Sequence, residues 1–252
     1  MASKPRAAST PPLPLFYRDP LPLSASVHAA WRLKEGDAAF AQDAAYAPLV
    51  LGELAAASAS YPVVFAGEQA APVAILGLEQ RNLFVADGQW APFVHVPAYV
   101  RRYPFGFIAT RDPDDFVLAI DAGSDRVVQA GEEGEPLFED GKPSALTLRA
   151  LAFCDAFKSE AAATAAFSQA LLDKGLLIER RADATLPDGR KLGLEGFQIV
   201  DYEAFQALDS DTLVDWHAKG WLALINFHLA SLDRFRVLLD REGAAAVEGG
   251  AT

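Results

Sequence analysis

The residue types in segment 82–108 point to binding chemistry rather than to a reaction. The segment combines seven aromatic side chains with two adjacent arginines, Arg101 and Arg102. Aromatic rings bury a large area at binding surfaces, and an arginine can hold a carboxylate with two parallel hydrogen bonds. We therefore predict a clamp for a carboxylate or phosphate beside an aromatic wall. The binding residues that we select from the segment are Asn82, Trp90, Arg101, Arg102 and Tyr103.

The same segment also has a purely structural interpretation. The arginines can brace the sheet by pairing with an acid such as Glu53 or Asp121, because a chain with 34 acidic residues offers many partners. Both interpretations of the arginines stay open at this point. The side chains of the segment that we expect to face the core are Leu83, Val85, Phe105 and Phe107.

Two further side chains carry groups that react in other proteins. His228 lies in an apolar helical stripe, where it could act as a general base or a metal ligand. We favour a core histidine whose ring bonds a backbone carbonyl or a carboxylate, since histidine is tolerated inside proteins when it is paired. Cys154, the only cysteine, has apolar neighbours, and we interpret it as an inert buried thiol.

The sequence contains none of the short motifs that mark common catalytic or metal sites. HExxH, CxxC and His-x-His, whose spacing would suit a metal ion, do not occur. The glycine-rich phosphate loops and the GxSxG nucleophile turn do not occur either. We therefore predict no metal and no cofactor, and we assign no catalytic residue.

Composition excludes several classes of partner. The chain has 252 residues, 51% of them hydrophobic, and a net charge of −12, which disfavours binding to nucleic acid and to anionic lipid. No window approaches the ~20 consecutive apolar residues of a membrane span. The proline-rich start lacks the apolar core of a standard signal peptide. We therefore expect a soluble, cytoplasmic protein without membrane insertion.

The pattern of apolar residues predicts an α+β fold. Residues 13–130 read as mainly antiparallel strands, and residues 144–240 as mostly helices, together forming a single domain over 13–240. Residues 1–12 read as a disordered arm and residues 241–252 as a flexible tail.

Turn and capping residues place the individual elements. Strands are expected at 61–67 and 72–80, and a hairpin turn at Asp87–Gly88. Ser144 is expected to cap a helix, a second helix at about 160–174 ends at Gly175, and a further helix covers 221–240. Residues 176–186 and 190–200 read as a hairpin, and Asp209, Ser210 or Asp211 caps the helix that follows it.

Several landmarks follow one another in a fixed order along the chain. They are Tyr61–Pro62–Val63–Val64–Phe65, Asn82–Leu83–Phe84–Val85, Asp87–Gly88–Gln89–Trp90, Arg101–Arg102–Tyr103–Pro104–Phe105, Gly196–Phe197–Gln198–Ile199–Val200–Asp201 and Gly220–Trp221–Leu222. Together they resemble the bacterial SapC family, over about residues 13–240. The family is named for an association with bacterial surface layers, so the resemblance implies a link to the cell surface. Because an export signal is not evident, it implies a cytoplasmic accessory role in surface-protein or nutrient-uptake systems.

Three functions follow as hypotheses. The first is a non-catalytic module that binds a peptide or protein segment, for which the partner is unknown and homo-oligomerisation is open. The second is an enzyme that acts on a small acid in a pocket near Arg101, Arg102 and His95. The third is a structural component of a surface layer.

Overall fold

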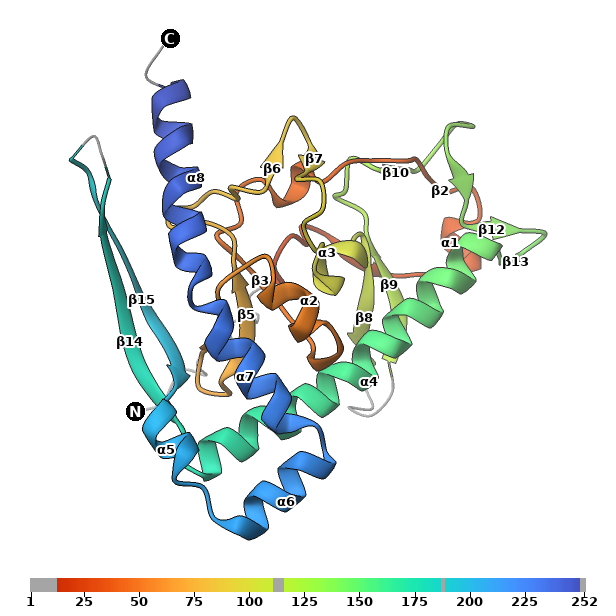
Figure 1. The fold of residues 1–252 in the computed structure, drawn as a ribbon. Helices are drawn as coiled ribbons and strands as arrows, with labels where there is room; N and C mark the ends of the chain where they lie inside the picture. The colour runs from red at the N-terminus through yellow and green to blue at the C-terminus, as the bar shows by residue number, and fades with distance from the viewer. Residues whose placement is uncertain (1–12, 111–115, 187–188, 250–252) are drawn as a thin grey trace, which may run out of the picture. The chain divides into compact units, whose positions relative to one another are not determined.

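The structure, a computed structural model, describes residues 13–110, 116–186 and 189–249 (Figure 1). Strands lie mostly in the N-terminal half and helices toward the C-terminus, which confirms the predicted α+β class. The chain forms two compact units: residues 1–35 with 103–148 make unit 1, and residues 36–102 with 149–252 make unit 2. The single domain over 13–240 stays a prediction, and the predicted arm at 1–12 lies outside the described residues.

Unit 2 is built on a five-stranded antiparallel sheet. The runs predicted as strands and the predicted hairpin of 176–200 all contribute to it. Only Phe197 and Gln198 of the hairpin pair with the neighbouring strand, so the described outer part of the hairpin is a two-stranded ribbon. In spatial order the strands are β14 (Leu177–Thr185), β15 (Lys191–Val200), β4 (Val63–Ala66), β5 (Ala71–Ile75) and β3 (Tyr46–Pro48).

Helices supply the core that packs against this sheet. The longest, α4 (Ala145–Asp173), is joined by α6 (Ser210–Ala218) and α7 (Trp221–Ser231) (Figure 1). Burying aromatic and aliphatic side chains between helix and sheet is the main stabilising term of such a layer. The buried cluster consists of Phe65, Ala70, Phe167, Leu171, Leu176, Val200, Trp216 and Ile225.

The helix α4 is one continuous element, whereas the sequence predicted two helices that meet near residue 159. No glycine or proline lies between Ala145 and Asp173, and the serine at 159 is tolerated in a helix interior. The two predicted ends are confirmed. The Ser144 hydroxyl accepts a hydrogen bond from the Thr147 N–H, and Gly175 has a left-handed φ of 63°.

The helix predicted over 221–240 is interrupted. α7 ends at Ser231, and α8 (Arg234–Gly249) begins after a turn at residues 232–233. The Ser231 hydroxyl donates to the His228 carbonyl, and such side-chain bonds compete with the helical ladder. α8 extends from Arg234 to Gly249, so residues 241–249 of the expected tail are helical, and Glu242 among them is 1% exposed.

His228 and Ser231 join α7 to two strands of the sheet. His228 Nδ1 lies 2.8 Å from the Val63 carbonyl of β4, and the Val200 N–H of β15 donates to Nε2 at 3.0 Å. The Val63 N–H donates to Ser231 Oγ at 2.9 Å. The two side chains thus satisfy backbone groups where β4 and β15 have stopped pairing with each other. The prediction of a paired core histidine is confirmed.

Short elements complete unit 2. In the hairpin of β6 and β7, Asp87 and Gly88 both have positive φ, so the predicted Asp–Gly turn is confirmed. The predicted cap of α6 is provided by Asp209, whose carboxylate accepts from the Thr212 N–H. The short elements are η1 (Ala39–Ala41), η2 (Leu51–Glu53), α2 (Leu54–Ser58), β6 (Val85–Ala86), β7 (Gln89–Trp90), α3 (Ala98–Arg101) and α5 (Tyr202–Gln206).

Unit 1 consists of small antiparallel sheets. Its buried Asp121 accepts hydrogen bonds from the Arg18 and Asp19 N–H groups and from the Tyr103 hydroxyl. These bonds join residues 18–19 and Tyr103 to the end of the strand that contains Asp121. The elements are β1 (Pro20–Pro22), β9 (Phe116–Asp121) and β8 (Phe105–Ala109), then β10 (Val127–Val128), β2 (Arg32–Leu33) and β11 (Glu135–Pro136), then β12 (Phe138–Glu139) and β13 (Lys142–Pro143), with the short helix α1 (Ala25–His28).

Candidate functional site

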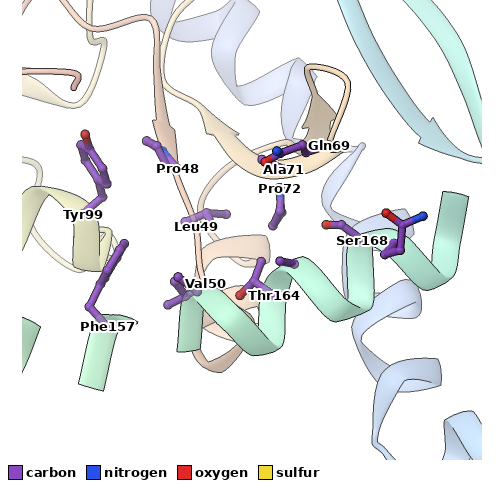
Figure 2. Close-up of a pocket in the computed structure, with 13 residues that line it drawn as sticks. Pro48, Leu49, Val50, Gln69, Ala71, Pro72, Tyr99, Phe157, Thr164 and Ser168 are labelled. Atoms are coloured by element: carbon purple, nitrogen blue, oxygen red, sulfur yellow. The ribbon is translucent and has the colours of Figure 1, made fainter. Parts of the chain in front are cut away.

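A groove of about 420 Å³ runs along one face of α4 in unit 2 (Figure 2). Its opposite wall comes from residues 48–50, at the end of β3 and just after it, and from Gln69, Ala71 and Pro72, at the turn that leads into β5. Tyr99 of α3 closes one end together with Phe157 of α4. The volume falls in the range of protein pockets that bind small molecules and short peptides.

The middle of the groove is apolar, and its hydroxyl groups are already used. Thr164 Oγ1 donates to the Glu160 carbonyl and accepts from the Leu51 N–H, while Ser168 Oγ donates to the Ala70 carbonyl. These bonds fix the loop walls to α4 and leave the apolar surface to line the space. At the end away from Tyr99, the exposed amide side chains of Gln69 and Gln169 border the groove.

Two arginines stand on aromatic rings at the Tyr99 end. The Arg102 guanidinium lies 4.2 Å from the centre of the Tyr99 ring and 4.3 Å from that of Phe157. Arg101 lies 5.2 Å from the centre of the Phe153 ring, and its Nε donates to the Val96 carbonyl at 3.1 Å. Cation–π packing of this kind holds a guanidinium in place while it keeps its charge. The rings under Arg102 are also walls of the groove, so a positive charge is fixed at its rim.

A buried carboxylate positions the helix that carries both arginines. Glu53 is 5% exposed, and its Oε2 accepts from the Ala98 N–H at the start of α3. The same oxygen lies 2.8 Å from His95 Nε2, and Oε1 accepts from the Val50 N–H. Glu53 therefore ties the 48–50 wall to α3 without forming an ion pair with Arg101 or Arg102 among the described contacts.

Two of the predicted binding residues, Asn82 and Trp90, form structural hydrogen bonds in the region that precedes α3. Asn82 is 1% exposed; its amide donates to the Ala41 carbonyl and its oxygen accepts from the Phe84 N–H. Trp90 is half-buried, and its indole N–H donates to the Tyr61 hydroxyl at 2.9 Å. The Tyr61 hydroxyl donates in turn to the His95 carbonyl. Neither Asn82 nor Trp90 lines the groove.

Tyr103 belongs to unit 1, whereas the other four predicted residues belong to unit 2. It is 3% exposed, and its hydroxyl donates to Asp121 Oδ2 at 2.8 Å. Burial raises the pKa of the Tyr103 hydroxyl above its usual value, so this group stays protonated and donates at neutral pH. Of the selected residues, only Arg102 contacts walls of the groove, through the Tyr99 and Phe157 rings, and Arg101 stacks on Phe153, which does not line the groove.

Burial makes the Cys154 thiol and the His228 ring unreactive at neutral pH. Burial raises the pKa of the Cys154 thiol to about 11, so the nucleophilic thiolate is scarce at neutral pH and the prediction of a buried thiol is confirmed. Burial lowers the pKa of His228 to about 4, so its ring is neutral between Val63 and Val200. Within the described part of the chain, no group of three or more His, Cys, Asp or Glu residues could hold a metal ion.

The groove itself was missed in the sequence analysis. Its walls come from two short segments and two helices that are separated in the sequence, and their residue types are ordinary for a core. One signal was available: Phe153, Phe157, Ala161 and Ala165 recur every four residues, which places them along one face of a helix. None of the described helices combines the length and apolar character needed to cross a membrane.

Comparison with known protein families provides the identification. The model of the family described as SapC matches residues 23–238, which is most of the chain. The chain belongs to the SapC family. The resemblance seen in its landmarks is therefore confirmed, and the SapC match spans all the elements that build the groove. Neither the curated proteins nor the solved structures contain a match to this SapC chain.

Proposed function

We propose that this SapC protein is a non-catalytic module that binds a segment of a peptide or protein in the groove along α4. The observation that carries the proposal is the combination of an apolar groove of about 420 Å³ with a guanidinium fixed at its rim. An apolar pocket buries side chains of a ligand, and an arginine at its edge sets the ligand's orientation.

We propose an accessory role in bacterial surface-protein or nutrient-uptake systems, with the protein located in the cytoplasm. In this role the module would bind a client segment and leave chemistry to other proteins. Cell fractionation tests the location. Recovery of the native protein in the soluble cytoplasmic fraction supports the role, whereas recovery with the surface layer favours the structural alternative.

Filling the groove tests the binding proposal. Ala165 is exposed on the groove face of α4, and Ala163 is exposed but does not line the groove. Positions two residues apart in a helix are rotated by about 200° around its axis, so the side chains of Ala163 and Ala165 point in nearly opposite directions. Ala165→Trp should therefore fill the groove, and Ala163→Trp adds the same side chain elsewhere.

The measurement is capture of partners from extract of the native bacterium, compared among wild type and both variants by quantitative mass spectrometry. We expect Ala165→Trp to lose a set of partners that wild type and Ala163→Trp retain. Matching thermal unfolding curves for the two variants would show that the loss is not a folding defect. Equal capture by all three proteins would contradict binding in the groove.

One observation favours an enzyme as the second candidate. The buried Glu53 carboxylate holds His95 Nε2 at 2.8 Å, and the His95 side chain is 19% exposed. A carboxylate that orients a partly exposed histidine is an arrangement used in general base catalysis. His95 does not line the groove, so a substrate would have to bind at a separate place on unit 2. A thermal-shift screen of small carboxylic acids that stabilises wild type but not His95→Ala would favour this candidate.

A further inference from the structure

Phe93 has a side chain and a backbone conformation that the packing of a single chain does not explain. The side chain is 106% exposed, the highest value among the exposed large apolar side chains of the described residues. Its φ is 62°, a left-handed conformation that bulky residues rarely adopt. Both features cost free energy in the free protein, the first through apolar surface in water and the second through steric strain. A bound state that buries the ring would offset them.

The turn around Phe93 does not need a phenylalanine. The Val94 N–H donates to the Ala91 carbonyl at 3.4 Å, which closes a turn of four residues. Pro92 holds the second position, where its fixed negative φ suits a type II turn. Phe93 holds the third position, which normally belongs to glycine or asparagine. Asparagine would therefore fit the same backbone better than the residue that is present.

The loop that carries Phe93 is held on both sides of the ring. Before it, the Ala91 N–H donates to the Phe84 carbonyl at 2.7 Å. After it, the Tyr61 hydroxyl donates to the His95 carbonyl. A side chain presented on a fixed loop loses little conformational freedom on binding, which favours affinity. Exposed aromatic rings of this kind act as anchors that fill an apolar pocket on a partner.

The groove along α4 is a pocket of matching chemistry on the same unit. Its middle is apolar, its volume is about 420 Å³, and the exposed Ala165 borders it. Phe93 does not line this groove within one chain. A second copy would bring its own Phe93 to the groove. Because every copy has both the ring and the groove, a two-fold axis would form two such contacts at once.

The charge beside Phe93 is positive. Arg101 is exposed, and its Nε donates to the Val96 carbonyl at 3.1 Å. Val96 follows Phe93 by three residues, so their Cα atoms are at most about 11 Å apart. The Arg101 guanidinium stacks on Phe153, which lies one helical turn outside the Tyr99 end of the groove. The ring and a fixed cation are thus presented together.

The far end of the groove carries the opposite charge. The amide of Gln169, which borders that end, donates to Asp173 at 2.8 Å. Glu68 lies in the turn that leads into the opposite wall, and both carboxylates are exposed. Lys174, the cation next to Asp173 in the sequence, is already bonded to another acid. In an antiparallel pair of copies, Arg101 of each would face these acids, and such charge complementarity sets the register of an interface.

We propose that two copies of this chain form an antiparallel pair in which Phe93 of each copy enters the groove of the other near Ala165. Arg101 of each copy then faces the partner's Glu68 and Asp173. The inference rests on the proposed function and specifies its regulation, because the ring occupies the space that a client segment needs. The pair is the closed form of the site, and a client segment opens it by displacing the ring.

Sedimentation velocity of the whole protein tests the pairing at concentrations up to about 100 μM, above the micromolar dissociation constants of weak specific interfaces. Wild type should sediment as a dimer. Phe93→Asn removes the ring and relaxes the turn, so it should unfold at the same or a higher temperature than wild type. Its dissociation constant should rise at least about thirtyfold, as expected for loss of an anchor residue. Val214→Asn is the matched control and should stay dimeric, because Val214 is 71% exposed on α6, outside the groove and the turn.

Crosslinking locates the ring in the pair. The photo-crosslinking residue p-benzoylphenylalanine replaces Phe93 in an equal mixture of protein with light and heavy nitrogen. We expect crosslinked dimers that carry both labels, with the attachment mapped to groove residues such as Ala165 or Pro72. Ala165→Trp in the same mixture should abolish them. Crosslinks within single chains only, or on residues outside the groove, would overturn the proposed contact.

The outcomes also separate this inference from the proposed function. A wild type that stays monomeric, or a Phe93→Asn variant that pairs like wild type, would overturn the inference and leave the groove to the capture experiment. In that experiment, Phe93→Asn should retain more of the groove-dependent partners than wild type, because its groove is no longer occupied. Loss of those partners would overturn the inference in favour of Phe93 as a direct anchor for another protein. Equal capture by wild type and Ala165→Trp would overturn the proposed function itself.

Discussion

At the scale of single residues, buried polar side chains in unit 2 act mainly as connectors. Glu53, Asn82 and His228 are each at most 5% exposed, and each bonds backbone groups from segments far apart in the sequence. Leaving a buried backbone group unpaired is costly, so these side chains specify where loops and helices attach. Arg102 differs from them because its guanidinium stacks on Tyr99 and Phe157, two rings that line the groove.

The pH dependence of stability follows from His228. Its pKa is about 4 in the folded protein, because burial disfavours the charged ring, against an ordinary value of 6.5. Between these values the unfolded chain binds a proton that the folded chain does not, so stability falls as the pH is lowered from about 6.5 to 4. The loss is about 3 kcal/mol.

Urea unfolding at several pH values measures this effect, and His228→Gln is the matched variant because its amide can donate and accept but does not titrate. The difference in unfolding free energy between wild type and variant should shrink as the pH falls from 6.5 to 4. A constant difference across that range would show that His228 does not titrate as its burial requires.

At the scale of elements, local signals located the turns and helix ends well. Asp87–Gly88, Ser144, Gly175 and Asp209 each act through backbone geometry or a hydrogen bond within a few residues, so the sequence alone shows them. The interruption at residues 232–233 was missed, because it depends on contacts of His228 and Ser231 with Val63, over 160 residues away. The groove was missed for the same reason.

The continuity of α4 predicts the sign of one substitution. Ser159 is exposed in mid-helix, where alanine is the better helix former, so Ser159→Ala should stabilise the protein by about 0.5 kcal/mol. A serine at the start of a second helix would instead cap it, and its loss would cost about 1 kcal/mol.

Chemical denaturation of Ser159→Ala decides between the two arrangements. Ser144→Ala is the control, because its hydroxyl does cap α4 and its loss should cost about 1 kcal/mol. A destabilisation of Ser159→Ala similar to that of Ser144→Ala would mean that α4 is two helices.

At the scale of the whole molecule, the two units are interleaved along the chain. Unit 2 needs residues 36–102 and 149–249 together, because β4 and β5 come from the first segment and β14 and β15 from the second. The boundary after Arg102 also divides segment 82–108, so Arg102 and Tyr103, adjacent in sequence, serve different units. Because Arg102 and Tyr103 are adjacent in the sequence, the sequence analysis placed them in a single binding site.

Hydrogen exchange should reflect this organisation. The slowest amides are expected in β4 and in α4 from Thr164 to Leu171, where side chains such as Phe65 and Phe167 are fully buried. The ribbon formed by residues 181–186 and 191–194 should exchange faster, because β14 and β15 pair only with each other there. Protection of the ribbon equal to that of β4 would contradict this view of the sheet.

The central claim is that a peptide segment binds along the groove face of α4. The most direct measurement replaces Ala165 with the photo-crosslinking residue p-benzoylphenylalanine in cells, with the same replacement at Ala163 as the control. After irradiation, we expect a partner to be attached covalently at position 165 and not at position 163, because only the first lines the groove. Equal crosslinking at both positions, or crosslinking at position 163 alone, would contradict the claim.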